Sequence, residues 1–384
     1  MEYTKLKCIN QYKSESINPA KTPDTVFEMY SVPIYETGHP EFLRGDEIAS
    51  NKAVVQKNDI LLCKINPRIN RVWVVSDESD KMNIASSEWI VIRNSEYNPE
   101  FLAWYFRTPK FQKLMTSEVT GIGGSLTRAQ PKCVAEYPVP VLDRVKQDEI
   151  VAILNKCKFV IESRKQELDA LDDLIKARFV EMFGDPIANP MGWIETTIGD
   201  ECFYIKDGPH KSLPDIGKEN GGHPFISVRN IVNGYIDFSS ARYISDEDYA
   251  DAIKKCHPEK GDMLYSKGGT TGIAKLIDID EEFANWVHVA VLKFDKTKLN
   301  GIFFENMLNG DYCYEQSQRL TKGIANRDLV LSAMAQIKMY RPPMELQEQF
   351  ADFVHQVDKS KVVVQKSLDQ TQILFDSLMQ KYFG

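Results

Sequence analysis

Two segments of about forty residues, 144–184 and 345–384, constrain the fold of this chain most strongly. Neither contains proline, and each contains glycine only as its last residue. Each follows a proline-containing stretch and ends in Phe-Gly, where glycine is a natural helix stop. The sequence therefore predicts two uninterrupted helices, each roughly 60 Å long at about 1.5 Å per residue.

Both predicted helices carry one apolar seam. Apolar residues recur in steps of three and four, and eight of the ten seam positions are apolar in each segment. A seam of this length has to be buried against another helix, and the simplest partner is the other copy. We therefore predict that the helices pair as an antiparallel coiled coil. The selected seam residues are Ile150, Leu154, Ile161, Leu168, Leu171, Ile175, Phe350, Val354, Val357, Leu368, Phe375 and Leu378.

Arg164 and Arg178 interrupt the first seam. A buried arginine needs a carboxylate, which the opposite helix or a partner protein can supply. The alternative is that both side chains extend along the helix to reach solvent. The sequence leaves these two readings open.

The chain also repeats itself with an offset of 200 residues. Within the helices Gln147, Leu168, Asp169, Leu174, Phe183 and Gly184 recur as Gln347, Leu368, Asp369, Leu374, Phe383 and Gly384. The regions before the helices are related more loosely: 58–61 matches 261–264, and 98–102 matches 300–304. Their short alternating apolar runs are typical of strands. We predict an α+β fold with an internal pseudo-two-fold duplication, divided into globular domains 1–143 and 185–343 and long helices 144–184 and 344–384.

The composition restricts the functional classes. The 384 residues include 47 basic and 55 acidic side chains, a net charge of −8, so the chain is not a general polyanion binder. A reader of DNA with this charge must focus its basic groups locally or borrow them from a partner. The seven cysteines form no C-x-x-C pair, and no apolar run reaches the roughly 20 residues that span a bilayer. These features are typical of a cytoplasmic protein with reduced thiols.

Motifs for catalysis are not recognisable. The segment 66–68 lacks the second proline and the aromatic residue of an adenine methyltransferase motif, and 268–275 has the wrong spacing for a P-loop. Cys256-His257 is an isolated pair rather than a set of metal ligands. We therefore expect a non-catalytic chain without a metal or cofactor of its own.

The layout, the helix exit RFVEMFGDPIANPMGW at 178–193, and the run from GPHKSLPD to GDMLYSKGGTTG resemble the specificity subunit of type I restriction–modification enzymes. The resemblance covers the whole chain and is clearest over 184–384. It implies two target recognition domains that each read half of a bipartite double-stranded DNA site. It also implies helices that hold two modification (methyltransferase) subunits and, with them, restriction (motor-nuclease) subunits. S-adenosylmethionine and ATP would then belong to these partners.

Base readout needs polar and basic side chains on loops that approach DNA closely. Glycine-rich loops allow such an approach. Each candidate has the alternative reading of an ordinary solvated loop residue. The candidates of the first domain are Lys64, Asn66, Arg68, Asn70, Arg71, Ser125, Thr127 and Arg128. Those of the second are Lys206, His210, Lys211, Arg229, Asn230, Lys267, Thr270, Thr271, Lys322, Asn326 and Arg327.

Two other functional classes compete with this interpretation. The first is a coiled-coil scaffold that presents two domains to a protein partner, which the acidic balance favours. The second is a stand-alone nuclease, which would have to cleave DNA without partners. Salt-dependent, sequence-selective DNA affinity distinguishes a DNA reader from a scaffold.

Overall fold

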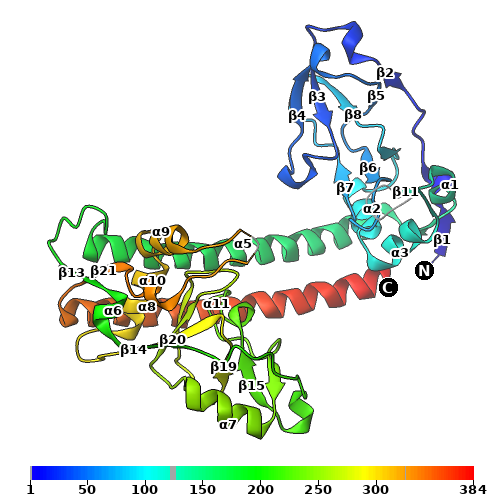
Figure 1. Ribbon diagram of the computed structural model, residues 1–384. Coiled ribbons are helices and arrows are strands. Elements are labelled where there is room, and N and C mark those ends of the chain that lie inside the picture. The colour runs from blue at the N-terminus through cyan, green and yellow to red at the C-terminus, as the bar shows by residue number, and fades with distance from the viewer. Residues whose placement is uncertain (1, 122–126, 325) are drawn as a thin grey trace. The chain divides into compact units, whose positions relative to one another are not determined.

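The computed structural model describes residues 2–121, 127–324 and 326–384 (Figure 1). The chain forms two compact units. Unit 1 comprises Met1–Arg164 and Ser367–Gly384, and unit 2 comprises Lys165–Lys366. Each long helix therefore contributes one half to each unit. The functional division into two recognition domains and two spacer helices stays a prediction.

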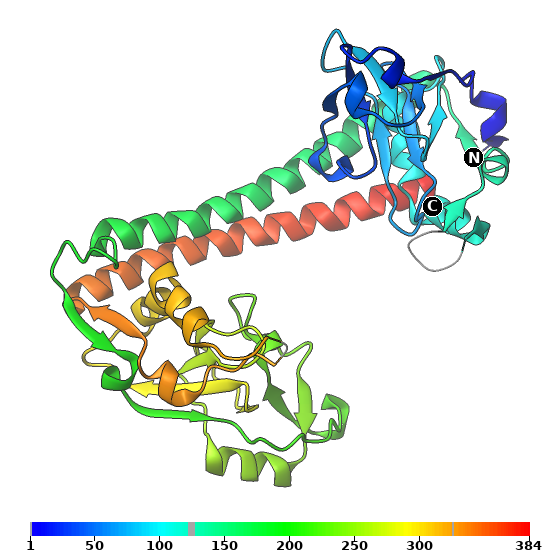
Figure 2. The same ribbon diagram turned by 45° about the horizontal axis from the view of Figure 1, so that its top comes forward.

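The two long helices are α5 (Arg144–Phe183) and α11 (Met344–Phe383). In unit 1 the beginning of α5, with Ile150 and Leu154, shares a core with Phe383 at the end of α11. In unit 2 the relation is reversed, because Phe183 at the end of α5 contacts Phe350 near the start of α11, with ring centroids 5.6 Å apart. The helices thus run antiparallel alongside each other (Figure 2). The predicted coiled coil is confirmed.

The predicted seam faces inward in both helices. Ile150, Leu154, Ile161, Ile175, Phe350, Val354 and Val357 are buried, whereas Leu168, Leu171, Leu368, Phe375 and Leu378 are half-buried. Apolar residues off the seam are exposed, as Phe159 and Val363 show at 69% each. The heptad spacing therefore selects the buried face correctly.

Of the two arginines in the seam, Arg178 reaches a carboxylate on its own helix. Its Nη1 lies 2.7 Å from Glu181 Oε2, one turn further along α5, and its guanidinium lies 5.6 Å from the centre of the Phe353 ring. The carboxylate therefore comes from α5 itself, a source that neither of the two readings named. The opposite helices are instead joined by Lys361, which bonds Asp172.

Unit 1 contains a five-stranded sheet of order β2-β5-β8-β3-β4 and a three-stranded sheet of order β7-β6-β9. Two-stranded pairs β1-β12 and β10-β11 complete it. Strand β6 has four buried residues, ILLC, because both of its faces are covered. The bounds are β1 Glu2–Lys5, α1 Leu6–Ile9, β2 Ser16–Ile17, η1 Pro19–Lys21, β3 Val26–Tyr30, η2 Tyr35–Thr37, β4 Glu41–Arg44, η3 Gly45–Glu47, β5 Lys52–Val54, β6 Ile60–Cys63, β7 Val72–Val74, β8 Met82–Ala85, β9 Trp89–Ile92, α2 Pro99–Phe106, α3 Pro109–Ser117, β10 Val119–Thr120, β11 Arg128–Ala129, α4 Pro131–Val134 and β12 Pro138–Val141.

Unit 2 contains a four-stranded sheet of order β14-β20-β17-β18, a three-stranded sheet of order β16-β15-β19 and the pair β13-β21. Its apolar core also takes in the ends of both long helices, through Phe179, Phe183 and Phe350. The bounds are β13 Ile194–Thr197, α6 Ile198–Glu201, β14 Cys202–Asp207, η4 Lys218–Asn220, β15 His223–Ile226, η5 Val228–Asn230, β16 Arg242–Ile244, α7 Asp246–Lys255, β17 Met263–Ser266, β18 Ala274–Leu276, β19 Ala284–Asn285, β20 Val289–Phe294, α8 Gly301–Asn309, α9 Asp311–Leu320, α10 Leu331–Met334 and β21 Lys338–Arg341.

Each unit has an aromatic-rich helix, α2 or α8, that begins at an asparagine. The Asn98 side chain accepts hydrogen bonds from the backbone N–H groups of Glu100 and Phe101. The Asn300 side chain accepts the corresponding bonds from Ile302 and Phe303. Such caps satisfy N–H groups that lack partners at a helix start. The predicted α+β fold with an internal duplication is confirmed. In the part of the chain that the structure describes, no helix has the length and apolar character to cross a lipid bilayer.

Candidate nucleic-acid interface

Most candidate residues of unit 2 gather at one edge of its four-stranded sheet, whereas Arg229 and Asn230 lie in η5, which follows β15 of the other sheet. Strands β14 and β17 both run antiparallel to β20, so both end where β20 begins. Glycines allow the segments that follow to approach closely. A Cβ at Gly208 would lie 1.7 Å from the carbonyl oxygen of Asn285, and one at Gly268 would lie 2.3 Å from the His288 ring. We call the segments 206–211, 267–272, 286–288 and 326–329 the loop edge of unit 2.

Backbone hydrogen bonds join the glycine-rich loop to the segment before α10. Leu329 N donates to Lys267 O at 2.7 Å, and Gly269 N donates to Arg327 O at 3.0 Å. Lys267 N in turn donates to His288 O at 2.8 Å. The structure therefore brings together two candidate groups that lie about sixty residues apart in the sequence, and joins His288 to them.

Lys267 points into the protein. Its side chain is buried, and its Nζ lies 2.9 Å from Asp328 Oδ1 and 3.6 Å from Asp207 Oδ2. Asp207 also bonds Lys255 Nζ at 2.9 Å. Lys267 thus links β14, the glycine-rich loop and the segment around Asp328. Its ammonium group compensates part of the negative charge of two carboxylates at the loop edge.

Asn230 and Thr271 are buried as well. Asn230 donates to Asp237 O at 3.0 Å and to Ser240 Oγ at 3.1 Å. The Thr271 hydroxyl lies 2.9 Å from that of Thr321. These two residues, like Lys267, shape the loops from inside the domain and do not face solvent as base-reading side chains must.

The remaining candidates of unit 2 are exposed. His210 lies 3.7 Å from Asp207, Lys211 lies 3.7 Å from Asp248, and Arg229 donates to Ser240 O at 2.7 Å. These contacts hold the side chains loosely at the surface and leave them accessible to a ligand. The exposed set is Lys206, His210, Lys211, Arg229, Thr270, Lys322, Asn326 and Arg327.

Unit 1 builds a similar edge from β6 and β9. Lys64 N donates to Glu88 O at 3.0 Å, Ala129 N donates to Lys64 O at 2.9 Å, and Asn66 N donates to Thr127 O at 2.8 Å. Asn66 has a positive φ of 47°, which asparagine tolerates better than most residues. We call the segments 64–71, 86–88 and 127–129 the loop edge of unit 1.

The side chains at this edge differ in their exposure and in their contacts within the protein. Arg128 forms an ion pair with Glu88 at 3.1 Å, and Asn70 turns inward to donate to Phe106 O at 3.2 Å. Arg68 is exposed. Lys64, Asn66, Arg71 and Thr127 are half-buried. Ser125 lies outside the described residues.

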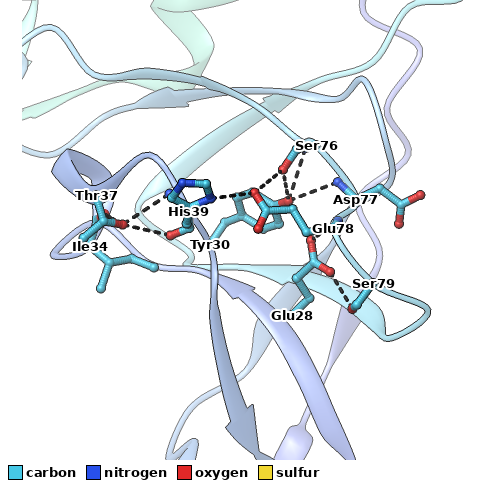
Figure 3. A network of polar contacts seen from close by, with 9 residues as sticks. All are labelled: Glu28, Tyr30, Ile34, Thr37, His39, Ser76, Asp77, Glu78 and Ser79. Carbon is cyan, nitrogen blue, oxygen red and sulfur yellow. Dashed lines mark hydrogen bonds and ion pairs between the residues drawn. The ribbon is translucent and has the colours of Figure 1, made fainter. Parts of the chain in front are cut away.

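A buried carboxylate organises another part of unit 1 (Figure 3). Glu28, on β3, accepts hydrogen bonds from the Tyr30 hydroxyl at 2.9 Å, from Glu78 N at 3.0 Å and from Ser79 Oγ at 2.7 Å. Glu78 also contacts His39 Nδ1 at 3.0 Å. This network ties the segment between β7 and β8 to β3. The sequence analysis did not identify it, because its members lie about fifty residues apart.

Three residues at or beside the loop edge of unit 2 were also missed. Trp286 and His288 lie in the turn before β20, with ring centroids 4.5 Å apart, and Arg242 begins β16. A tryptophan next to basic residues can indicate a ligand-binding surface. Trp286, however, adjoins an apolar run that predicts a strand, so the pattern indicates a core residue.

Residues 190–370 match the family model described as type I restriction modification DNA specificity domain. Over these residues the predicted resemblance to type I specificity subunits is confirmed.

Solved structures share the fold over the full length. The S subunit of the type I restriction–modification system from M. genitalium has a TM-score of 0.60 at 15% identity, and the match covers 100% of this chain and 96% of that one. A chain from a structure on complex assembly and conformational transition of the type I R-M system has a TM-score of 0.59 at 19% identity, with 100% and 97% covered.

Proposed function

We propose that this chain reads an asymmetric, bipartite double-stranded DNA site, one half with the loop edge of each unit. The observation that carries the proposal is the recurrence of one backbone arrangement with different side chains. Glu88 and Arg128 in unit 1 correspond to His288 and Asp328 in unit 2, because Lys64 and Lys267 make the same backbone bonds. Two readers with one scaffold and different loops recognise two different half-sequences.

We propose the exposed residues of the loop edges as the DNA contacts. The proposal keeps Arg68 in unit 1 and, in unit 2, the exposed residues that stand in the loop-edge segments: Lys206, His210, Lys211, Thr270, Asn326 and Arg327. Arg229 and Lys322 lie outside those segments and are not proposed as base contacts. The proposal also omits Lys267, Asn230 and Thr271, whose polar groups are engaged inside the domain. These basic residues concentrate positive charge locally, which answers the difficulty that a net charge of −8 raises for DNA binding.

We further propose that the long helices hold two modification subunits, and through them restriction subunits. Exposed apolar residues off the seam support this: Phe159 and Ile373 in unit 1, at 69% and 70%, and Val362 and Val363 in unit 2, at 67% and 69%. Apolar side chains exposed to this degree on a helix are typical of a surface that binds another protein. S-adenosylmethionine and ATP would be bound by those partners, and this chain would have no catalytic role.

The test is to determine the methylated motif of the complex by sequencing methylated DNA from cells with and without this chain. Substitution of Lys206 and Lys211 by glutamine should change or relax only one half of the motif, and Arg68→Gln only the other. A lost bidentate base contact costs about 1–3 kcal/mol of discrimination. If the motif is independent of the chain, or if purified complexes bind all DNA sequences equally, the scaffold alternative is correct.

A further inference from the structure

Unit 2 has a small cavity beside its loop edge. The cavity measures about 140 Å³ and is lined by Phe225, Ser227, Arg229, Arg242 and Trp286. This is the volume of roughly five water molecules at about 30 Å³ each. It is large enough for one small anionic group.

The cavity lining is rich in hydrogen-bond donors. Arg229 and Arg242 contribute two guanidinium groups. Trp286 Nε1 is buried and has no hydrogen-bond partner among the residues that the structure describes. Because solvent does not reach Nε1, the donors available to a ligand in the cavity are the two guanidinium groups. Donors of this kind match the oxygen atoms of a phosphate group.

A carboxylate lies near the two arginines. Asp215 Oδ1 accepts hydrogen bonds from Tyr243 N at 3.0 Å and Gly217 N at 3.2 Å. These backbone donors lower the pKa of Asp215, and Arg242 and Arg229 add smaller contributions. Asp215 is therefore a carboxylate that hydrogen bonds hold to the backbone beside the cavity. The two guanidinium groups carry two positive charges against its one negative charge.

The position of the cavity connects it to DNA reading. Trp286 N donates to Ile226 O at 2.8 Å, which fixes the turn between the two sheets of unit 2. The Trp286 ring contacts the His288 ring. The carbonyl oxygen of His288 accepts a hydrogen bond from Lys267 N. A ligand in the cavity would therefore lie next to DNA that contacts the loop edge.

Unit 1 lacks this lining. Strand β15 pairs in parallel with β19 and antiparallel with β16, and β3 pairs in the same way with β8 and β4. In this register Met29 corresponds to Phe225, Glu41 to Arg242 and Ser86 to Trp286. The same backbone thus carries a glutamate and a serine where unit 2 carries an arginine and a tryptophan.

We propose that the cavity lined by Arg229, Arg242 and Trp286 binds one phosphodiester group of the DNA backbone next to the half-site read by unit 2. This inference rests on the proposed function. Phosphate contacts fix the register of a protein on DNA without reading sequence. The bipartite site would then be anchored asymmetrically, through unit 2.

The experiment measures DNA affinity of the full chain, co-purified with its modification subunits, against salt concentration. The double variant Arg229→Gln/Arg242→Gln should reduce the slope of log affinity against log salt by about one, the value for one lost phosphate contact. The methylated motif should stay unchanged. Trp286→Phe replaces the indole by the smaller phenyl ring, which removes part of the cavity wall, and should weaken binding of all sequences by one factor.

The matched control is Lys260→Gln/Lys298→Gln. It also removes two positive charges from unit 2, but from side chains that precede β17 and follow β20, at the opposite edge of the sheet. Its salt slope should equal that of the wild type. An unchanged slope in the arginine variant would overturn the proposal, and so would an altered half-motif, because the arginines would then read bases.

A second arm identifies the source of the phosphate. Inorganic phosphate is titrated into the wild type and the arginine variant at constant ionic strength, with tryptophan fluorescence as the readout. If phosphate binding is lost in the variant while the DNA salt slope is retained, the cavity serves a free anion and the DNA proposal is wrong. If the wild-type complex shows no sequence-selective binding at all, the proposed function fails and not this inference alone.

Discussion

The two units agree in their interiors and differ at their loop edges. The buried side chain of Gln147 accepts a hydrogen bond from Asn98 N at 2.8 Å and donates one to Leu142 O at 2.8 Å. Gln347 is buried, accepts Asn300 N at 2.8 Å and donates to Pro342 O at 2.8 Å. One glutamine in each unit thus joins the start of a long helix to the cap of the aromatic helix.

A buried aspartate recurs in the same way. Asp59, which precedes β6, accepts a hydrogen bond from Gln56 N and forms an ion pair with Arg93. Asp262, which precedes β17, accepts a hydrogen bond from Glu259 N and forms an ion pair with Lys293. At the loop edges, by contrast, equivalent positions hold opposite charges, as Arg128 and Asp328 do. Buried polar contacts therefore specify the shared scaffold, whereas the residues of the loop edges are free to differ.

The largest expected effect comes from the buried aspartates. Asp59→Ala removes both oxygens that Arg93 contacts, at 2.7 and 2.6 Å, and should cost about 3 kcal/mol, because a partly buried charge loses its partner. Asp262→Ala should cost less, about 2 kcal/mol, since Lys293 keeps Glu259. Hydrogen exchange of β6 and β17 measures each cost locally.

Asp46→Ala serves as the control, because the pair of Asp46 with Arg44 is half-exposed and is worth under about 1 kcal/mol. A larger cost for Asp262→Ala than for Asp59→Ala would show that Glu259 does not compensate, and the two pairs would not differ as described.

The second prediction tests the recurring glutamines. Gln147→Leu and Gln347→Leu keep a similar volume. The first leaves one N–H and one C=O group without the glutamine as a partner, and the second also frees the Lys298 C=O group, which Gln347 contacts at 3.2 Å. Each should cost about 2 kcal/mol, at the low end (about 1 kcal/mol) of the range for an unsatisfied buried group. Urea unfolding monitored by circular dichroism gives the cost. Gln380→Leu, on an exposed face of α11, should change stability little. A clearly larger cost for Gln147→Leu than for Gln347→Leu would contradict this account, because Gln347 makes one hydrogen bond more.

The sequence predicted the scaffold well for a physical reason. Helix periodicity and the recurrence of Gln147 and Phe183 two hundred residues later report local constraints and buried contacts, which leave a pattern. Phe183 and Phe383 are indeed buried, against Phe303 and Phe101. The pairing order of the strands was not predictable, because alternation of apolar residues does not say which strand lies beside which.

The candidate interface was predictable only as groups of loops. Lys267 stands between a strand and two glycines, a setting that suits a surface lysine. Its partners Asp207 and Asp328 lie about sixty residues away on either side, so nothing in the local sequence indicates that the side chain turns inward. Tertiary ion pairs of this kind decide which polar loop residues face solvent.

The third prediction concerns the lysines at equivalent positions, Lys267 and Lys64. Lys267→Met leaves Asp207 and Asp328 without their shared cation and should cost about 2 kcal/mol, less than for a fully buried pair, because Asp328 is half-exposed. It should also relax the half-motif of unit 2. Lys64 forms no side-chain ion pair with a described residue, so Lys64→Met should change stability by less than about 0.5 kcal/mol.

Lys267→Arg is the conservative variant and should restore the half-motif if the positive charge is what positions the loops. Thermal unfolding and methylated-motif sequencing are measured together. Loss of stability without any change in the motif would show that Lys267 has a purely structural role.

The smallest expected effect concerns the one residue that separates the two aspartate pairs. Unit 2 has Glu259 where unit 1 has Gln56, and Glu259 Oε2 lies close to Lys293 Nζ. The hydrogen bond from Lys293 lowers the pKa of Glu259 below its ordinary value of 4.5. A carboxyl with a lowered folded-state pKa stabilises the fold above its ordinary pKa, and this contribution disappears as the pH falls through the lowered value.

Glu259→Gln makes unit 2 resemble unit 1 at this position. Because Glu259 is 59% exposed, the cost at pH 7 should be only about 0.2–1 kcal/mol. The difference from the wild type should shrink as the pH falls from 5 toward 3, and Gln56→Glu in unit 1 should add a gain of similar size beside Arg93. Urea unfolding at a series of pH values measures both. A cost for Glu259→Gln that stays constant down to pH 3 would mean that packing rather than charge accounts for it, and the two aspartate pairs would then be electrostatically alike.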